Sequence, residues 1–176
     1  MLILETERLR LRRLVPDDLD ELYALYADPV VRRYFPEGTL TYRETQEELE
    51  WFLHGHPRQP RLGLWATVLK STGQFIGRCG LLPWTIEGRD EVEVAYLLGQ
   101  AYWGQGLGTE AARAIRDYGF EQLGLARLVA LIDHENLASR RVAENIGMTF
   151  EKEGRDAKGP FMLYALQGPT TAKAEP

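Results

Sequence analysis

Cysteine and histidine are scarce in this sequence. Cys79 is its one cysteine, so a disulfide within the chain is excluded. A lone cysteine in an apolar strand is usually buried, which argues against a reactive, catalytic thiol. His54 and His56 stand close together in "HGHP", but no third ligand accompanies them, and a helix carboxyl end accounts for histidine equally well. We therefore expect no metal site.

Positive charge and long apolar runs are also lacking. Lysine and arginine number 21 against 26 aspartates and glutamates, a formal net charge of -5. That sign is wrong for a nonspecific nucleic-acid binder and suits a cationic partner better. No apolar run approaches the roughly 20 residues that cross a bilayer, and the run in "MLILETERLRLRR" is far shorter than a signal-peptide core. We expect a cytoplasmic protein that binds neither nucleic acid nor membrane.

The chain does contain enough apolar sequence for a core. With 176 residues, 44% of them hydrophobic, it has the size of one compact domain, which we expect over residues 1–167. The segment 168–176, "GPTTAKAEP", is rich in small residues and proline and is expected to be a disordered tail. Monomer and homodimer both remain open.

Periodicity predicts a mixed α/β order. The two-residue period of "ERLRLRRL" indicates a strand, and helical spacing after Pro16 indicates a helix. Thr41 and Glu44 have the spacing of a capping box and mark a second helix. A hairpin around residues 71–73 and a strand at 91–98 follow. The remaining pattern predicts a helix, a strand, a helix and two strands, at residues 109–124, 127–133, 136–147, 148–154 and 161–167.

The strand at 91–98, "EVEVAYLL", is expected to present its residues alternately to two faces. Val92, Val94, Tyr96 and Leu98 alternate with a second set that begins with two carboxylates. Glutamate is unusual on an otherwise apolar strand face, which makes this strand a candidate source of a catalytic base.

Glycine occupies every second position in "YWGQGLGTEAARAIRDYGF", at Gly104, Gly106 and Gly108, just before a predicted helix. Such a turn suits phosphate, because the free N–H groups of the first helical turn and the helix dipole both favour an anion. A P-loop would need a lysine after its last glycine, where Thr109 stands. Glycines needed only for tight packing at the helix start are the alternative without a ligand.

A dinucleotide-binding turn is a more serious alternative. Asp133 ends the next predicted strand, about where a ribose-binding acid would lie. Against it, the third fingerprint glycine would fall on Thr109, and residues 99–103 separate the strand from the first glycine. The opening of the chain also fits poorly with an initial βαβ unit.

Three stretches carry a family resemblance. "VAYLLGQAYWGQGLGTEA" resembles the acetyl-CoA pyrophosphate loop of the GNAT superfamily of N-acetyltransferases. "TERLRLRRLVPDDLDELYALYADPVVRRYF" resembles the opening of its ribosomal-protein N-terminal acetyltransferase-like branch, and "NLASRRVAENIGMTFEKEG" is similar to the family's next helix and strand. The resemblance runs from about Thr6 to Leu166. One departure is Trp103, where the superfamily favours glutamine or arginine, although an aromatic residue is common there in this branch.

The resemblance implies a mixed, mostly antiparallel sheet of six or seven strands, splayed near the fourth strand and flanked by about four helices. Acetyl-CoA would lie in the splay as acetyl donor, with its pyrophosphate on backbone N–H groups of about residues 105–109. The implied cofactor-binding residues are Leu97, Leu98, Trp103, Gly104, Gln105, Gly106, Leu107, Gly108, Thr109, Asn136 and Ser139.

Glu93 is the first candidate for the general base, because partial burial on the strand face would make its carboxylate more basic. Glu91 and Glu153 are weaker candidates. The position of Asn136 predicts a helix cap. The resemblance implies that Asn136 also contacts CoA and that Ser139 donates a proton to the leaving thiol. Relatives often carry a tyrosine acid where this chain has Ala143, so Tyr96 and Tyr164 stay open as substitutes.

The acceptor implied by the resemblance is a protein or peptide N-terminal amine. A small cationic amine, such as a polyamine or aminoglycoside, is the alternative, and the acidic composition suits it. A non-catalytic acyl-CoA-binding module is a third reading.

Overall fold

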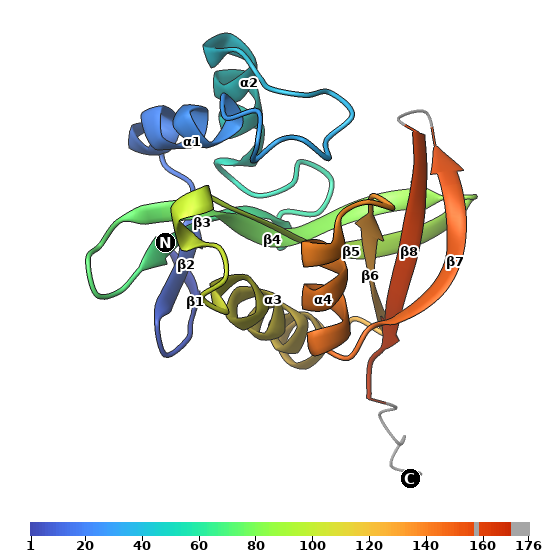
Figure 1. Cartoon of the computed structure of the whole chain (residues 1–176). Helices are drawn as coiled ribbons and strands as arrows, with labels where there is room; N and C mark the ends of the chain where they lie inside the picture. The colour runs from blue at the N-terminus through green and yellow to red at the C-terminus, as the bar shows by residue number, and fades with distance from the viewer. Residues whose placement is uncertain (157–158, 170–176) are drawn as a thin grey trace, which may run out of the picture.

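A computed structural model describes residues 1–156 and 159–169 of the chain. Most of the expected tail, residues 170–176, lies outside the described residues. The fold is an eight-stranded sheet in the order β1-β2-β3-β4-β5-β6-β8-β7 with four α-helices (Figure 1). The strands are β1 Leu2–Glu5, β2 Leu9–Arg13, β3 Gly63–Leu69, β4 Phe75–Ile86, β5 Arg89–Leu98, β6 Arg127–Ile132, β7 Thr149–Asp156 and β8 Gly159–Gln167. The helices are α1 Leu19–Tyr26, α2 Tyr42–Phe52, α3 Leu107–Asp117 and α4 Leu137–Asn145.

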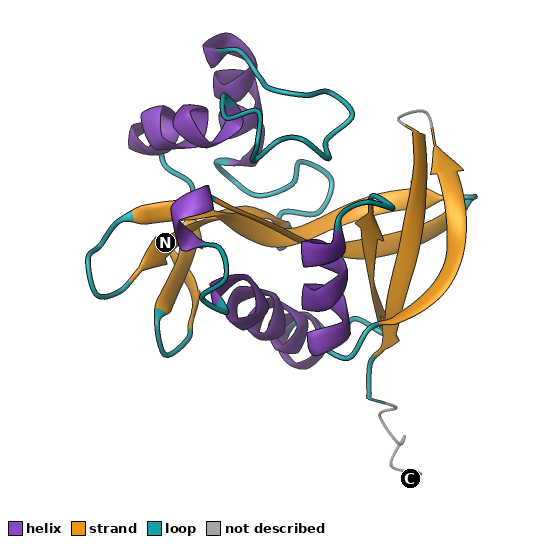
Figure 2. Ribbon diagram, viewed as in Figure 1, coloured by secondary structure: helices purple, strands orange, loops and turns teal. Residues whose placement is uncertain are grey.

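Helices cover both faces of the sheet (Figure 2). α1 and α2 lie on one face, and α3 and α4 lie on the other. The two faces of β5 alternate as its sequence predicted: Val94 packs in the same cluster as Ile115 of α3, and Ala95 packs in the cluster of Leu49 of α2. The expected mixed α/β fold is confirmed, and β5 is buried between the two helical layers.

The sheet has one strand more than the sequence predicted. Residues Leu2–Glu5 form the edge strand β1, which pairs antiparallel with β2 through Leu4 and Leu11. Four residues are too few to show a two-residue period, so only pairing with β2 identifies this strand.

The sheet opens between β5 and β6, its parallel neighbour. β4 and β5 stay in register from Gly77 opposite Leu98 to Ile86 opposite Arg89. Across the described residues of β5 and β6, by contrast, Glu93 opposite Val129 is the one registered pair. The fourth strand predicted from the sequence is β5, so the splay expected near that strand is confirmed. From Val94 onward one backbone edge of β5 lacks a partner strand.

Local capping agrees with the sequence at α2. The Thr41 side chain accepts a hydrogen bond from the Glu44 N–H at 3.3 Å, and the Glu44 carboxylate accepts one from the Thr41 N–H at 2.7 Å. The predicted capping box is therefore confirmed. None of the helices in the described part of the chain is long and apolar enough to cross a membrane.

Replacing Thr41→Ala should lower the free energy of unfolding by about 1 kcal/mol, because the N-cap bond at the start of α2 is lost. Arg43→Ala on the same helix is the control. Its ion pair with Glu47 is largely exposed, and its loss should cost less than about 0.5 kcal/mol. Urea denaturation of the three proteins measures both values. Equal stability of the Thr41 variant and the parent would contradict the capping role.

Candidate active site

A cavity of about 1330 Å³ occupies the splay. Its wall includes every predicted cofactor residue except Gln105, namely Leu97, Leu98, Trp103, Gly104, Gly106, Leu107, Gly108, Thr109, Asn136 and Ser139. The same cavity continues past Glu93 to residues on the α1 and α2 side. It therefore joins the two faces of the sheet at the gap between β5 and β6.

The glycine turn at the start of α3 has a left-handed backbone. Gly104 has φ of 73° and Gly106 has φ of 77°, values that glycine adopts without the steric penalty of a Cβ atom. A Cβ at Gly104 would meet no atom within 4 Å, and one at Gly106 would lie 3.6 Å from Arg8 Nη2. Gly108 is helical, with its nearest neighbour at 3.8 Å. Tight packing therefore does not account for these glycines, whereas turn geometry accounts for two of them.

The first turn of α3 presents unused donors. Its first helical bond runs from the Glu110 N–H to the Gly106 carbonyl at 3.0 Å. The N–H groups of Leu107, Gly108 and Thr109 precede it and have no carbonyl within the helix to bond. All three residues line the cavity, so this end of it is suited to an anion.

Arg8 and Glu110 hold the turn in place. The Glu110 carboxylate accepts hydrogen bonds from the Thr6 hydroxyl, from the Arg8 N–H at 2.9 Å and from Arg8 Nε at 2.6 Å. Burial alone would raise the pKa of Glu110, but these hydrogen bonds outweigh it and hold the pKa below its ordinary value. Arg8 Nη1 also donates to the Gln105 carbonyl at 2.9 Å. The sequence analysis did not identify this contact between the β1–β2 turn and the glycine turn.

Trp103 and Gln105 play structural parts in the same turn. Trp103 Nε1 donates to the Leu98 carbonyl at 2.7 Å, while nearly half of the residue is exposed at the cavity. The backbone carbonyl of Gln105 accepts the hydrogen bond from Arg8, and the Gln105 side-chain amide donates to the Ala101 carbonyl at 2.8 Å. The indole thus joins the end of β5 to the turn.

Asn136 and Ser139 lie across the cavity at the start of α4. The Asn136 side chain accepts from the Ser139 N–H at 3.0 Å, which confirms its prediction as a helix cap. The Tyr96 hydroxyl donates to the Ser139 carbonyl at 2.8 Å. Burial raises the pKa of Tyr96 above its ordinary value, so its hydroxyl keeps its proton. All three residues line the cavity, and Tyr96 connects β5 to α4 beneath it.

Glu93 lies at the point where the splay begins. It is partly buried and lines the cavity, and its Oε2 accepts a hydrogen bond from Trp84 Nε1 at 2.6 Å. Its Oε1 lies 3.4 Å from the Leu131 nitrogen, which donates to it. The strand face predicted for this carboxylate is the one observed, and Trp84 fixes its orientation.

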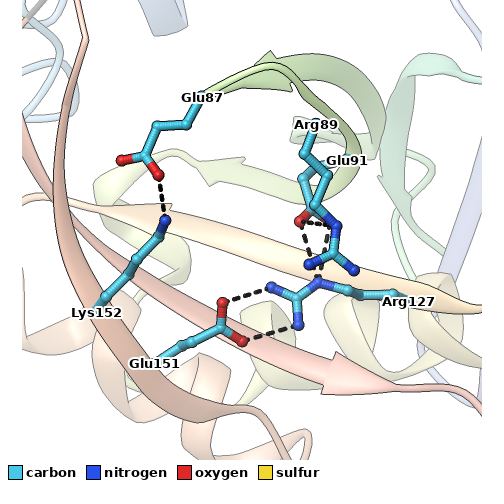
Figure 3. A network of polar contacts seen from close by, with 6 residues as sticks. All are labelled: Glu87, Arg89, Glu91, Arg127, Glu151 and Lys152. Carbon is cyan, nitrogen blue, oxygen red and sulfur yellow. Dashed lines mark hydrogen bonds and ion pairs between the residues drawn. The ribbon is translucent and has the colours of Figure 1, made fainter.

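Glu91 and Glu153 are placed differently. Glu91 is buried in the ion-pair network of Figure 3, where Arg127 Nε lies 3.1 Å from its carboxylate. Arg127 also binds Glu151 through two hydrogen bonds of 2.8 Å, which lower the pKa of Glu151. The Glu153 side chain is 70% exposed. Neither Glu91 nor Glu153 lines the cavity, so Glu93 alone of these three candidates reaches it.

Three other candidates from the sequence lack access or ligands. Tyr164 is buried outside the cavity lining, where its hydroxyl accepts from Arg140 Nε at 3.1 Å. Cys79 is fully buried, and burial raises the pKa of its thiol. His56 borders the cavity, but no group of three potential metal ligands occurs among the described residues.

Comparison with known proteins agrees with this geometry. The family model of the "Acetyltransferase (GNAT) domain" matches residues 8–149. The chain is 38% identical to the uncharacterized protein YkkB of Bacillus subtilis, over 92% of this chain and 93% of that protein.

Solved structures agree as well. The acetyltransferase (GNAT family) from Bacillus anthracis superposes with a TM-score of 0.79 at 25% identity, over 95% of this chain and 98% of that one. An acetyltransferase from Agrobacterium tumefaciens gives a TM-score of 0.76 at 29% identity, over 93% of each chain. The P-loop and dinucleotide-binding alternatives for the glycine turn are therefore wrong. This chain belongs to the GNAT family and is an acetyl-CoA-dependent N-acetyltransferase.

Proposed function

We propose that acetyl-CoA enters the splay from the α3 and α4 side. Its diphosphate lies against the N–H groups of Leu107, Gly108 and Thr109, and its pantetheine arm follows the unpartnered edge of β5 beyond Glu93. The cavity that crosses the gap between β5 and β6 is the observation that carries this proposal, because it lets a donor on one face meet an acceptor on the other.

The acceptor we propose is the α-amine of a protein or peptide N-terminus. An α-amine with pKa near 8 loses its proton at pH 7 for about 1.4 kcal/mol, whereas a lysine-like amine with pKa about 10.4 needs about 4.6 kcal/mol. Of the three glutamates considered as the base, Glu91, Glu93 and Glu153, Glu93 is the one that lines the cavity, so the easier deprotonation suits the site.

Named relatives supply the alternative of a small-molecule amine. The FsC-acetyl coenzyme A-N(2)-transacetylase of Aspergillus fumigatus is 31% identical, over 83% of this chain and 64% of that protein. The spermidine N(1)-acetyltransferase of Escherichia coli is 27% identical, over 82% of this chain and 74% of that one. The net charge of -5 favours such a cation overall.

The cytoplasm remains our proposal for where the reaction occurs.

The proposed reaction is direct transfer. Glu93, directly or through water, first takes a proton from the acceptor ammonium, and the freed lone pair of the nitrogen attacks the thioester carbonyl carbon. The C–S bond of the tetrahedral intermediate then breaks, and the second proton lost by the nitrogen passes to the leaving thiolate. A thiol with a pKa of about 8.5 leaves readily, so the hydroxyl of Ser139 or Tyr96 is a helpful acid but not an essential one. Burial of Cys79 argues against a covalent intermediate.

Gly106→Val should weaken CoA binding at least tenfold, about 1.4 kcal/mol, because a branched side chain would distort the anion-binding turn. Gly73→Val is the matched control, since Gly73 has a similar left-handed φ of 73° and open space in the β3–β4 turn. Both variants should lose stability, but only the first should lose affinity in isothermal titration calorimetry. Equal CoA affinity in a folded Gly106 variant would remove the diphosphate role of the turn.

Glu93→Gln should slow transfer most for the most basic acceptors, because the variant keeps the shape but cannot take a proton. On a peptide α-amine, raising the pH to about 9 should restore much of the rate, whereas a polyamine should need pH above about 10. The measurement is a pH profile of kcat/KM on both acceptors, with the exposed Glu153→Gln as control. Parallel losses at every pH on both acceptors would show that Glu93 is not the base.

Ser139→Ala and Tyr96→Phe should each lower kcat less than about tenfold while CoA affinity stays nearly unchanged, given the good leaving thiol. Steady-state kinetics with CoA titrations of both variants provide the check. A loss beyond about a thousandfold in either variant, with CoA binding preserved, would identify an essential acid.

A further inference from the structure

Two arginines lie in the part of the cavity on the α1 and α2 side. Arg78 on β4 pairs in register with Leu97 of β5, and Arg32 follows α1. They are only 6% and 3% exposed, yet both line the same cavity as Leu97 and Glu93. Arginine is almost never buried without partners, so the contacts of these two side chains need an explanation.

Their contacts are mostly aromatic. The guanidinium of Arg32 lies 5.1 Å from the Tyr26 ring and 4.2 Å from the Phe35 ring, and that of Arg78 lies 5.6 Å from both rings. Arg78 Nε donates to the Tyr26 hydroxyl at 2.9 Å, and this hydroxyl donates to Glu48. Tyr26 therefore links Arg78 to the Glu48 carboxylate.

Both guanidinium groups have N–H donors that the hydrogen bonds within the described part of the chain do not use. Within the described part of the chain, the terminal nitrogens of Arg78 make no hydrogen bond, and Arg32 uses Nε on the Gly38 carbonyl while Nη2 is 3.9 Å from Glu37. Among the described residues, the buried side-chain nitrogens and oxygens without a partner are Arg13 Nη1 and Thr67 Oγ1. The terminal nitrogens of Arg78 are not among them, so they reach the open space of the cavity.

The two charges also repel one another. Burial lowers the pKa of Arg32, and the neighbouring charge of Arg78 lowers it further. Two adjacent buried cations would be stabilised by a bound anion and destabilised by a cationic ligand. The carboxylates of Glu37 and Glu48 offset part of this positive charge. Glu37 lies beside Arg32, and Glu48 lies behind Tyr26, so the terminal nitrogens of Arg78 still favour an anion over a polyamine.

We propose that the acceptor carries a carboxylate as well as its amine, and that Arg78, assisted by Arg32, binds the carboxylate while Glu93 faces the amine. This inference rests on the proposed function, since it concerns the acceptor of the same reaction. The paired N–H groups of a guanidinium match the two oxygens of a carboxylate.

The spacing along β5 suits a small acceptor. Leu97, the register partner of Arg78, lies four residues from Glu93 on the same strand face, roughly 13 Å at 3.3 Å per residue. The long arginine side chain and the shorter glutamate both reach into this span. A free amino acid or the first residues of a peptide would fill the remainder, with a main-chain or a side-chain carboxylate as the anion.

The test compares acceptors that differ only in carboxylate against carboxamide. The pairs are alanine and alaninamide, Ala-Ala and its amide, and the amides of Ala-Glu and Ala-Gln. Values of kcat/KM are corrected for the fraction of neutral amine. We expect the parent to prefer the carboxylate by at least tenfold in one or more pairs. The pair that shows this preference identifies whether the site binds the carboxylate of a free amino acid, of a peptide C-terminus or of a side chain.

Arg78→Gln should abolish this preference and leave the KM for acetyl-CoA unchanged. The double variant Arg78→Gln with Glu48→Gln removes the charge of Arg78 together with that of the partly buried Glu48, which Tyr26 links to it, so it covers the case in which the single variant fails to fold. Arg127→Gln is the matched control: its side chain is 9% exposed and outside the cavity lining, and its loss should lower stability without changing the preference.

Equal use of both members in every pair, or a preference that survives in a folded Arg78 variant, would overturn the inference and leave the proposed transferase activity standing. A polyamine used better than every carboxylate would overturn it as well. Absence of acetylation on all amines would instead contradict the proposed function, and the inference with it.

Discussion

The loss of pairing between β5 and β6 after Glu93 and Val129 is the constraint on which the site depends. A continuous sheet would separate α3 and α4 from α1 and α2, and no ligand would touch both layers. Because β4 keeps β5 in register along its length, β5 stays ordered while its other edge remains open. The cavity, the proposed base Glu93 and the helix start of α3 are all arranged around that edge.

Two sets of hydrogen bonds hold the segments beside the open edge of β5. Arg8 and Glu110 fasten the glycine turn to the β1–β2 turn, and the Tyr96 hydroxyl fastens β5 to the Ser139 carbonyl of α4. The Arg8 side chain is 44% exposed, so solvent screening limits its ion pair with Glu110 to about 1 kcal/mol or less, and the turn is held by this pair together with the other hydrogen bonds. Preformed geometry matters here because acetyl transfer depends mainly on positioning.

Local patterns in the sequence were sufficient for much of this fold. The alternation of β5, the capping box at Thr41, the cap at Asn136 and the glycine turn each depend on neighbouring residues, and each was predictable. β1 was not, because four residues show no period and its identity comes from β2. Arg8 and Glu110 are 102 positions apart, and no short motif reports such a contact.

The net charge of the chain and the charges inside the cavity also differ in what the sequence could predict. The composition gives a net charge of -5, which suggested a cationic acceptor. The cavity instead gathers Arg32 and Arg78 from a loop and a strand far apart in the chain. Average charge describes the outer surface and its long-range field, whereas the cavity places two guanidinium groups in one buried site.

Backbone amide hydrogen exchange, measured with and without saturating CoA, tests most directly whether the splay is the donor site. We predict slower exchange at residues 94–98 and 105–110, where β5 and the start of α3 line the gap, and unchanged exchange at the β3–β4 turn. Protection confined to α1 and α2, or no protection at the glycine turn while CoA is bound, would contradict the account.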